Sequence, residues 1–470
     1  MNYLDRIDEY KEEMLATLKE LISIKSVVEP PVGDLPFGEG VDKAFKYFLK
    51  IGEDAGFKTT NVDNYGGHLE FSGEEGSEIM AILGHLDVVP EGNDWDFPPY
   101  GGEIKDGKLY GRGAIDNKGP MIAAFYALKA LKDSNIETEK RVRIIIGLDE
   151  ETNWDGMKYY MERSEKPDFG FTPDADFPVI HGEMGILKFE IVKKINKSLK
   201  PGIKLISLRG GNAPNMVADN CHATLFTSDV QSLKNKLAEY RDRTGNNIGI
   251  KVYEKNVKLI AQGISAHGAH PENGRNAISM MMELLGELQI NNEDISEFVE
   301  FYNEKIGFNL HGEKISLSLE DQESGMLIFN VGQAAIDKET ARIIVNIRYP
   351  ISCTDDDVYD ILAKEIEQYD LGIMKISNTK PIYMEKDCEI VTSLMDIYRK
   401  HSGDIESQPM VIGGGTYARS MDNAVAFGAC FPGEEEVAHQ KNEYIRIDSL
   451  MKSAKIFAEA IYTLAKGHSV

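Results

Sequence analysis

Five short polar clusters contain side chains that could bind metal ions. Their central residues are His85 with Asp87, Asp116, the adjacent Glu150 and Glu151, Asp174, and His439. Two histidines together with three or more carboxylates form a nitrogen and oxygen ligand set that suits zinc, cobalt or manganese. Each cluster alone is common in ordinary polar loops, so the prediction of a metal site rests on their combination.

His85 and Asp87 lie in the segment Gly84-His85-Leu86-Asp87. Residues two apart on an extended segment project to the same side. This spacing suits a metal-binding histidine whose second ring nitrogen is held by a carboxylate. The alternative is an ordinary polar loop, which is the commoner origin of an isolated His-x-Asp pair.

The carboxylates of the other clusters also have ordinary and functional interpretations. Asp116 precedes a helix expected to begin at Pro120, so it could cap that helix or bridge two cations with one oxygen each. Glu150 and Glu151 follow a strongly apolar segment. Neighbouring carboxylates at the end of a buried strand repel each other unless cations compensate them. One glutamate could bind a metal while its neighbour transfers protons.

Alternating strand and helix patterns extend to about residue 180. Apolar runs predict buried strands at 79–83 and 141–148, and apolar residues every three to four positions predict a helix at 120–132. This alternation favours an α/β fold, with a mostly parallel sheet flanked by helices. Ligands of such sheets bind beyond the carboxyl ends of the strands, where these polar clusters begin.

The pattern changes between residues 183 and 383. Strands and helices are mixed there, with expected strands at 187–192 and 341–348 and expected helices at 232–240 and 277–288. We expect residues 183–383 to form a large inserted α+β lid domain. Residues 1–182 and 384–470 would form the catalytic, metal-binding domain, which ends in a helix at about 448–466.

Composition narrows the functional classes. Of the 470 residues, 42% are hydrophobic and 27% are charged, and the formal net charge is −25. Such a chain repels phosphate backbones and anionic lipids, which disfavours nucleic-acid and membrane partners. Residues 1–22 have helical periodicity without the pattern of a secretory signal, and no apolar run is long enough to span a membrane. Four scattered cysteines without a CxxC pair indicate a reduced, cytoplasmic location.

Six motifs occur along the chain in the order GHLDVVP, GRGAIDNKGP, DEET, TPDADFP, SAHGAHPENGRNA and GGGTYAR. In this order they resemble the dinuclear-metal exopeptidase family, which includes aminoacylase, glutamate carboxypeptidase and succinyl-diaminopimelate desuccinylase. The resemblance covers nearly the whole chain and is greatest to the peptidase V dipeptidases. It implies a cytoplasmic hydrolase that cleaves the amide bond of small unblocked peptides. The motifs specify the family much more closely than the substrate.

The resemblance also implies two divalent metal ions per chain, with zinc expected first and manganese or cobalt as alternatives. His85 and Asp174 would bind one ion, Glu151 and His439 would bind the other, and Asp116 would bridge both.

The same resemblance assigns roles to two residues beside the ligands. Asp87 would orient His85. Glu150 would be the general base, taking a proton from the water that bridges the metals and passing it to the leaving amine. The family also has a cis peptide bond after the bridging aspartate, here Asp116–Asn117.

Residues of the insert match further family motifs. His267 fits the histidine that stabilises the tetrahedral oxyanion better than His270, which would be an ordinary loop residue. Asn215 and Arg348 match the clamp on the substrate carboxylate in peptidase V, and a guanidinium suits that role because it can pair with a carboxylate bidentately. Without the family, they would be an ordinary loop asparagine and a strand-end arginine.

The glycine-rich segment Gly413–Arg419 would place the backbone amides of Gly414 and Gly415 near the same carboxylate. It could also be a phosphate-binding turn, but it lacks the lysine of a P-loop. The insert spans roughly 200 residues, a full domain. As in peptidase V, it could cover its own active site, so we expect a monomer.

Two alternatives to a dipeptidase stay open. An N-acyl-amino-acid deacylase would use the same chemistry with a different pocket. A non-catalytic binding protein on the same fold is less favoured, because every expected ligand position and Glu150 are filled. A nucleotide-binding protein is weaker still, since Gly111-Arg112-Gly113 does not complete a GxGxxG motif.

Overall fold

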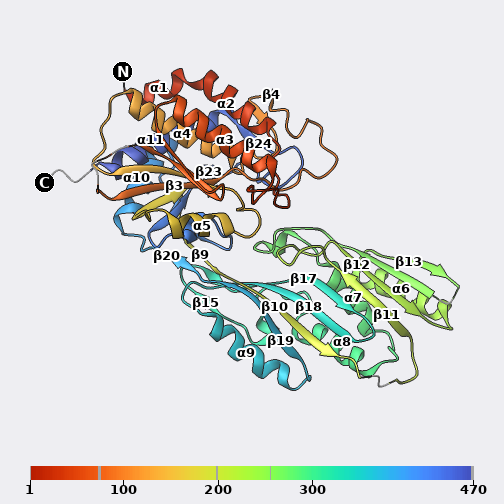
Figure 1. Cartoon of the computed structure of the whole chain (residues 1–470). Helices are drawn as coiled ribbons and strands as arrows, with labels where there is room; N and C mark the ends of the chain where they lie inside the picture. The colour runs from red at the N-terminus through yellow and green to blue at the C-terminus, as the bar shows by residue number, and fades with distance from the viewer. Residues whose placement is uncertain (1, 72, 74–75, 197–198, 255, 467–470) are drawn as a thin grey trace. The chain divides into compact units, whose positions relative to one another are not determined.

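The computed structural model describes residues 2–71, 73, 76–196, 199–254 and 256–466. The chain divides into two compact units (Figure 1). Unit 1 comprises Met1–Gly182, Tyr383–Val411 and Gly415–Val470, and unit 2 comprises Glu183–Ile382 and Ile412–Gly414. The division expected from the sequence differs at two places, since it assigned residue 383 to the insert and residues 412–414 to the catalytic domain.

Unit 1 is built around the main mixed sheet. The strands follow the order β1 (Lys58–Val62), β2 (Gly66–Phe71), β6 (Arg141–Gly147), β3 (Ile79–His85), β7 (Phe169–Thr172), β22 (Ala424–Phe427) and β9 (Val179–Glu183), extended by β20 (Ile382–Tyr383) and β21 (Met410–Ile412). The four central strands, from β6 to β22, are parallel. Antiparallel pairing begins on either side of them, at β2 and at β9. The predicted α/β fold is confirmed, and its parallel part is the centre of the sheet.

The apolar character of β3 and β6 explains their central position. Every residue of β3 is buried, and in β6 only Arg141 is partly exposed. A strand buried on both faces must be apolar throughout, and this is why both strands could be recognised from the sequence.

Helices cover both faces of this sheet. They are α1 (Tyr3–Glu9), α2 (Lys11–Ser23), α3 (Glu39–Asp54), α4 (Lys118–Asp133), α5 (Asp155–Arg163), α10 (Glu389–Ser402) and α11 (Ile447–Ala465). On β2, Leu69 faces Gly52 of α3, whereas the adjacent His68 accepts or donates a hydrogen bond with the Tyr160 hydroxyl of α5. Successive strand residues point to opposite faces, so α3 and α5 lie on opposite sides.

Two helix predictions need correction. The single helix expected over residues 1–22 is two helices that meet at Tyr10, and Met1 lies outside the described residues. Helix α4 begins at Lys118, so Pro120 is its third residue and not its first. Its position in the first turn still suits proline, because the first backbone N–H groups of a helix have no partner within the helix.

Two small sheets complete unit 1. One has the order β24 (Tyr444–Arg446), β5 (Lys108–Tyr110) and β4 (Glu103–Lys105), and the other pairs β23 (Ala429–Cys430) with β8 (Ala175–Asp176). The pairing of β24 with β5 brings residues near the end of the sequence beside the loop that contains Asp116.

Unit 2 contains an eight-stranded antiparallel sheet. Its order is β13 (Ile248–Tyr253), β14 (Asn256–Gln262), β12 (Asn220–Phe226), β11 (Lys204–Gly210), β17 (Ile328–Ile336), β18 (Thr340–Tyr349), β10 (Gly185–Lys194) and β19 (Gly372–Thr379). In β10, fully and partly buried residues alternate, which is typical of a strand with one face packed on a core.

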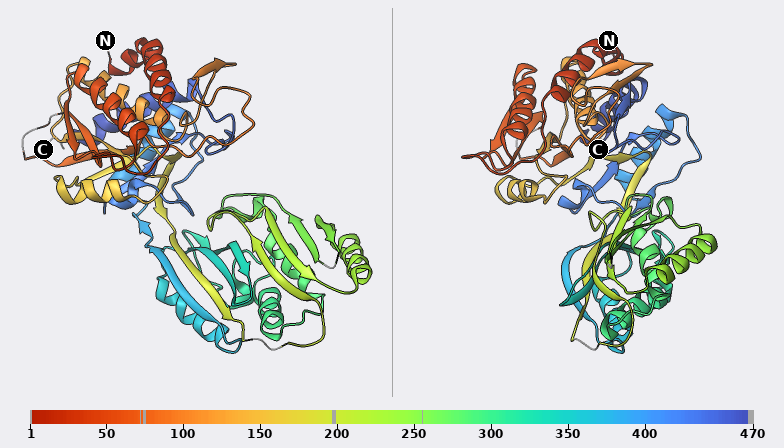
Figure 2. Two further views of the ribbon diagram at one scale, coloured as in Figure 1. Left: turned by 45° about the vertical axis from the view of Figure 1, so that its right-hand side comes forward. Right: turned by 90° about the vertical axis from the view of Figure 1, so that its right-hand side faces the viewer.

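The helices of unit 2 pack along this sheet (Figure 2). They are α6 (Val230–Thr244), α7 (Ala277–Gly286), α8 (Glu293–Lys305) and α9 (Asp355–Glu367); β15 (Glu320–Asp321) and β16 (Gly325–Met326) form a separate hairpin. The predicted α+β character of the insert is therefore observed. Among the described residues, no helix is both long enough and apolar enough to cross a membrane.

Candidate metal centre

The carboxyl ends of three neighbouring parallel strands bring most of the predicted ligands together. His85 is the last residue of β3, Glu150 and Glu151 follow β6, and Asp174 follows β7. Because these strands run in the same direction side by side, the segments after them meet at one edge of the sheet. Asp116 reaches this edge from the loop between β5 and α4.

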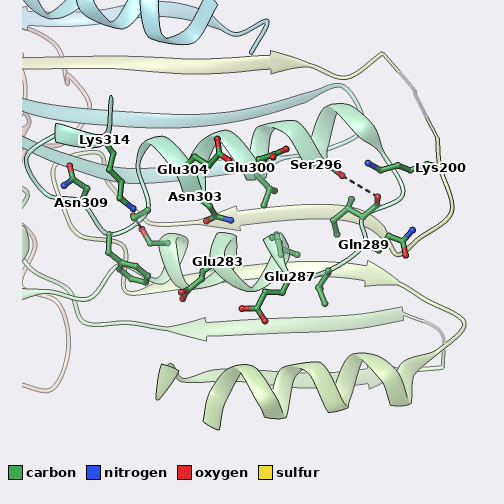
Figure 3. Close-up of a pocket in the computed structure, with 18 residues that line it drawn as sticks. Lys200, Glu283, Glu287, Gln289, Ser296, Glu300, Asn303, Glu304, Asn309 and Lys314 are labelled. Carbon is green, nitrogen blue, oxygen red and sulfur yellow. Dashed lines mark hydrogen bonds between the residues drawn. The ribbon is translucent and has the colours of Figure 1, made fainter. Parts of the chain in front are cut away.

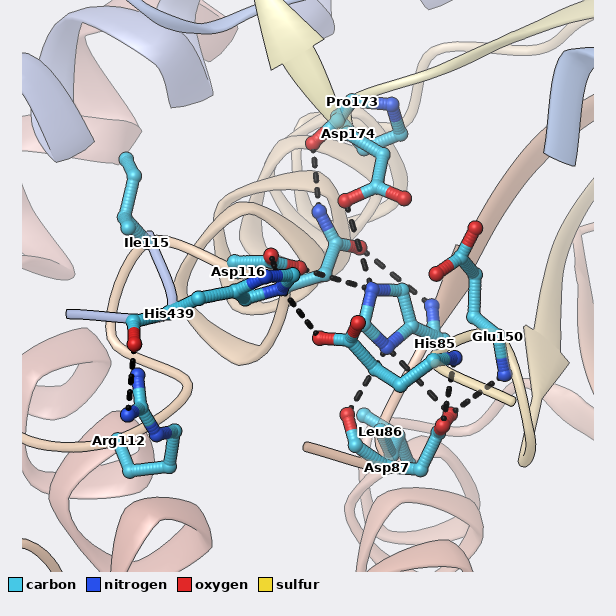
Figure 4. Close-up of polar contacts among 12 residues, drawn as sticks. His85, Leu86, Asp87, Arg112, Ile115, Asp116, Glu150, Pro173, Asp174 and His439 are labelled. Atoms are coloured by element: carbon cyan, nitrogen blue, oxygen red, sulfur yellow. Dashed lines mark hydrogen bonds and ion pairs between the residues drawn. The ribbon is translucent and has the colours of Figure 1, made fainter. Parts of the chain in front are cut away.

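Asp116 lies between two histidines (Figure 4). Its Oδ1 is 3.0 Å from Nε2 of His85, and its Oδ2 is 2.9 Å from Nε2 of His439. Nε2 of His85 is also 3.5 Å from Oδ1 of Asp174. Nε2 of His439 is 2.9 Å from Oε1 of Glu151. Each oxygen of Asp116 thus belongs to a different set of potential ligands.

We call these sets the first group (His85, Asp116, Asp174) and the second group (Asp116, Glu151, His439). Within each group, the potential ligand atoms all lie within 4.8 Å of one another. Ligands about 2.0–2.1 Å from a tetrahedral zinc ion are roughly 3.3 Å apart. Contacts of 2.9–3.5 Å are therefore close to the spacing that a bound ion requires. The donor atoms, imidazole nitrogens and carboxylate oxygens, fit two divalent ions.

The ionisation of both histidines reflects the surrounding carboxylates. Burial alone would lower the pKa of His85, but Asp174 and Asp116 outweigh it and hold this pKa well above its usual value. Burial is the largest single influence on His439 and would lower its pKa, but Asp116 and Glu151 together outweigh it and raise this pKa to about 11. Half of the His439 side chain is exposed, so solvent screens part of this effect. Without metal, protons on the histidines compensate the negative charge that two cations would neutralise.

The two glutamates after β6 differ in their contacts. Glu151 belongs to the second group, whereas Glu150 belongs to neither. Burial and the nearby negative charges of Asp174 and Glu151 raise the pKa of Glu150 well above its usual value, with His85 opposing them. Burial and Asp116 raise the pKa of Glu151 to about 7. Glu150 is therefore a partly buried carboxylate beside the potential ligands and is not itself placed as one.

Asp87 contacts both His85 and the glutamate loop. Nδ1 of His85 is 2.9 Å from the backbone carbonyl oxygen of Asp87 and 3.4 Å from its Oδ1. The two carboxylate oxygens of Asp87 accept the backbone N–H groups of Glu150 and Glu151, each at 3.1 Å. The nearest partner of the His85 ring is thus the Asp87 backbone, and the Asp87 carboxylate holds the loop that contains both glutamates.

The sequence analysis missed three buried residues around these ligands. Asn117 contacts the segments of the first group, and the ion pair between Arg112 and Glu443 contacts those of the second. Arg112 and Asn117 lie within the motif GRGAIDNKGP, which was the one available signal for them. The peptide bond between Asp116 and Asn117 is cis, as the family resemblance implies.

The predicted substrate-binding residues of the insert lie together in unit 2. The backbone N–H of Gly268, next to His267, donates a hydrogen bond to the carbonyl oxygen of Asn215 at 2.7 Å. A Cβ atom on Gly413 would lie 3.1 Å from the Ala269 side chain and 3.4 Å from Cγ of Arg348. Gly414 belongs to unit 2 and Gly415 to unit 1.

A cavity of unit 2 lies apart from these predicted residues. It has a volume of about 880 Å³, lies between α7 and α8, and contains no residue of the predicted site (Figure 3). Four glutamates line it: Glu283 from α7, Glu287 at the C-cap of α7, and Glu300 and Glu304 from α8. No histidine among the described residues lines this cavity, unlike the two groups of potential ligands in unit 1.

Comparison with known proteins identifies the family. The sequence pattern of the peptidase family M20/M25/M40 matches residues 81–463, most of the chain. The chain belongs to this family. It is 37% identical to the candidate dipeptidase YtjP of Bacillus subtilis, over 99% of this chain and 100% of that protein. It is 36% identical to a candidate dipeptidase of Staphylococcus epidermidis, over 98% of each. The predicted family resemblance is confirmed.

Solved structures share the fold of this M20 peptidase. Human carnosine dipeptidase 1 superposes with a TM-score of 0.60 at 15% identity, covering 98% of both chains. The dipeptidase Dug1p of Saccharomyces cerevisiae has a TM-score of 0.59 at 12% identity, covering 99% of this chain and 98% of that one. At these identities the comparison establishes the fold alone.

Proposed function

We propose that this M20 peptidase is a dipeptidase that depends on two metal ions and hydrolyses the amide bond of small peptides with a free N-terminus. The observation that carries the proposal is the position of Asp116, with one carboxylate oxygen in each of the two groups. The candidate dipeptidases aligned over their full lengths support the substrate class.

The first group would hold one ion and the second group the other, with zinc favoured by the nitrogen and oxygen ligands and manganese or cobalt as alternatives. Bound divalent ions supply electrostatic activation of water and of the scissile carbonyl. Glu150 would accept a proton from the attacking water and transfer it to the leaving amine. Its partly buried position and raised pKa support this role, because a general base works best with a pKa near the operating pH.

Unit 2 would supply the groups that recognise the rest of the substrate. His267 would donate a hydrogen bond to the developing oxyanion. Asn215, Arg348 and the backbone amides of Gly414 and Gly415 would bind the substrate carboxylate. Their support is the hydrogen bond from Gly268, next to His267, to Asn215 and the close approach of Arg348 to Gly413.

We further propose a cytoplasmic monomer in which unit 2 acts as the lid over the chain's own metal centre. The support is the size of the insert, from Glu183 to Ile382, which is a complete domain with its own core. Asp87 would position His85 and the loop of Glu150.

The test combines metal analysis of the purified protein with a panel of free dipeptides and N-acyl amino acids. We expect two divalent ions per chain and hydrolysis of the dipeptides. Preference for the N-acyl amino acids would instead identify a deacylase. A protein that binds two ions and hydrolyses neither class would contradict the proposed activity.

A further inference from the structure

Arg112 and Glu443 form an ion pair inside unit 1. Their side chains are joined by a 2.6 Å contact between Nη1 and Oε2, and both residues are almost completely buried. Removing two charges from water is costly, so a buried ion pair is weak support for stability by itself. The other hydrogen bonds of the two side chains indicate a second role for the pair, which is to hold the loops of the second group in place.

Glu443 fixes the loop of Asp116. Its Oε1 accepts the backbone N–H groups of Ile115 at 3.0 Å and of Asp116 at 3.2 Å. Its backbone carbonyl oxygen accepts the N–H of Gly111 at 2.9 Å. Both ends of the segment from Gly111 to Asp116 are therefore tied to one residue, which the pairing of β24 with β5 places beside them.

Arg112 fixes the loop of His439. Its Nη2 donates to the carbonyl oxygen of His439 at 3.3 Å, and also lies 3.4 Å from the carbonyl oxygens of Pro90 and Glu91. His439 has a φ of 63°, in the left-handed region that non-glycine residues rarely occupy. A backbone in this conformation needs support from its surroundings, and the Arg112 guanidinium provides it at the carbonyl.

The first group is held by a different residue. The buried side chain of Asn117 donates through Nδ2 to the carbonyl oxygen of Pro173 at 2.7 Å, next to Asp174. Its Oδ1 accepts the backbone N–H of His85 at 3.4 Å. Asn117 thus joins the backbones beside the two ligands that belong to the first group alone.

We propose that Arg112 and Glu443 are positioning residues of the second group and that Asn117 is the positioning residue of the first. Glu443 also holds Asp116, which both groups share, so the separation rests on Arg112 at His439 and on Asn117 beside His85 and Asp174. The two metal ions could then be lost one at a time. The inference deepens the proposed function, because it rests on the two groups each holding an ion.

The experiment replaces the ion pair by apolar side chains of similar size. Such replacements of buried pairs often leave stability unchanged, so Arg112→Met with Glu443→Leu removes the hydrogen bonds without leaving a buried charge. The matched control is Arg143→Met with Glu70→Leu. Arg143 and Glu70 form another buried pair of unit 1, also 2.6 Å apart, which contacts no metal-binding loop.

Each protein is stripped of metal and titrated with Co²⁺, with binding followed by visible absorption and by elemental analysis after gel filtration. We expect the wild type and the control to bind two ions. The Arg112/Glu443 variant should bind one ion with unchanged affinity and the second about 10- to 100-fold more weakly, the usual effect of losing a partner of a ligand. Asn117→Ala should also weaken one of the two ions.

Combined substitutions identify the ion that remains. In the Arg112/Glu443 variant, adding Asp174→Ala should remove the remaining tightly bound ion, whereas adding His439→Ala should leave that ion bound. In Asn117→Ala the two additions should have the opposite effects. If the double substitution prevents folding, as circular dichroism would show, Arg112→Lys provides the comparison, because it keeps a positive charge beside Glu443 and removes the Nη2 contact with the carbonyl oxygen of His439.

Several outcomes would overturn the inference. They are equal weakening of both ions in the Arg112/Glu443 variant, unchanged binding of both, or the same loss in the Arg143/Glu70 control. In all three, a wild type that binds two ions and hydrolyses dipeptides would leave the proposed function intact. A wild type that binds no ion would overturn both.

Discussion

Oδ1 of Asp87 accepts the backbone N–H of Glu150 at 3.1 Å. This contact joins the segment after β3 to the segment after β6, and it holds the general-base candidate through its backbone N–H. Asp87 also lies beside His85, so one buried side chain connects a candidate metal ligand with the candidate general base.

Asp87→Asn should impair catalysis while preserving the fold. An amide presents one N–H₂ group where the carboxylate has an oxygen, so one of the two backbone N–H groups after β6 would lose its acceptor and the loop would shift. We expect a fall in kcat/KM of about 10- to 100-fold, as for other residues that orient a metal site. Steady-state kinetics with a dipeptide tests this, and unchanged kcat/KM would mean that the carboxylate does not position the loop.

Glu150→Gln and Glu151→Gln should have different effects. Glu150→Gln removes a proton acceptor and no ligand, so metal content should stay at two ions while kcat falls about 100- to 10,000-fold. Glu151→Gln removes a ligand of the second group and should lower metal occupancy. Elemental analysis alongside kinetics distinguishes the two variants. An exchange of these behaviours would reverse the roles assigned to the adjacent glutamates.

Removal of metal should abolish activity, and the affinity for metal should increase with pH. In the metal-free protein, the pKa values of His85 and His439 are raised, so near neutral pH both rings carry protons that a metal ion must displace. The affinity should increase by roughly tenfold per pH unit for each proton displaced. Calorimetric titration with Zn²⁺ in buffers of different ionisation enthalpy measures the protons released. Binding that releases none, or activity that survives complete chelation, would contradict the assignment.

His267→Ala should lower kcat more than it weakens substrate binding. An interaction made mainly in the transition state has this kinetic signature, and one such donor is typically worth about 3 to 4 kcal/mol. His270→Ala is the control, since its exposed ring pairs only with the nearby Glu272 among the contacts that the structure describes. Mixing His267→Ala with Glu150→Gln protein should restore no activity if each chain closes its own site. Restored activity would show that His267 acts across a dimer.

His68 should make the folded protein sensitive to acid. Burial, with a smaller effect of Arg143, lowers the pKa of His68 from 6.5 to about 4. Between these values the unfolded chain binds more protons than the folded chain. The stabilisation is therefore complete above pH 6.5 and is lost as the pH falls to about 4. The loss at this one site is about 3 kcal/mol.

Replacing His68 by glutamine should remove this part of the pH dependence. The free energy of unfolding in urea, measured near neutral pH and near pH 4.5 for both proteins, gives the comparison. His270→Gln, on an exposed loop, should behave as the wild type. A wild type and a His68 variant with the same acid sensitivity would show that His68 does not contribute.

The sequence predicted those parts of the fold that depend on local patterns. The strands at 79–85 and 141–147 were recognisable because continuous apolar runs end in polar loops, and parallel neighbours bring such loops together. The break between α1 and α2 at Tyr10 was missed because apolar spacing continues across it.

Contacts between distant residues could not be read from local patterns. Arg112 and Glu443 are separated by 331 positions, and in the sequence neither differs from an ordinary surface residue. Only the pairing of β24 with β5 brings them together. The nearest partner of the His85 ring is the backbone carbonyl of Asp87 and not its carboxylate. This depends on the exact path of the chain after β3, which the sequence does not specify.

The position of β22 has a consequence for synthesis on the ribosome. This strand, Ala424–Phe427, lies between β7 and β9, so the main sheet stays split until nearly the whole polypeptide has been translated. The strands from β10 to β19 that form the core of unit 2 are all made earlier. The inserted unit can therefore fold while the chain is still being synthesised. During that interval the part of unit 1 made earlier lacks β22, and it stays accessible to chaperones and proteases.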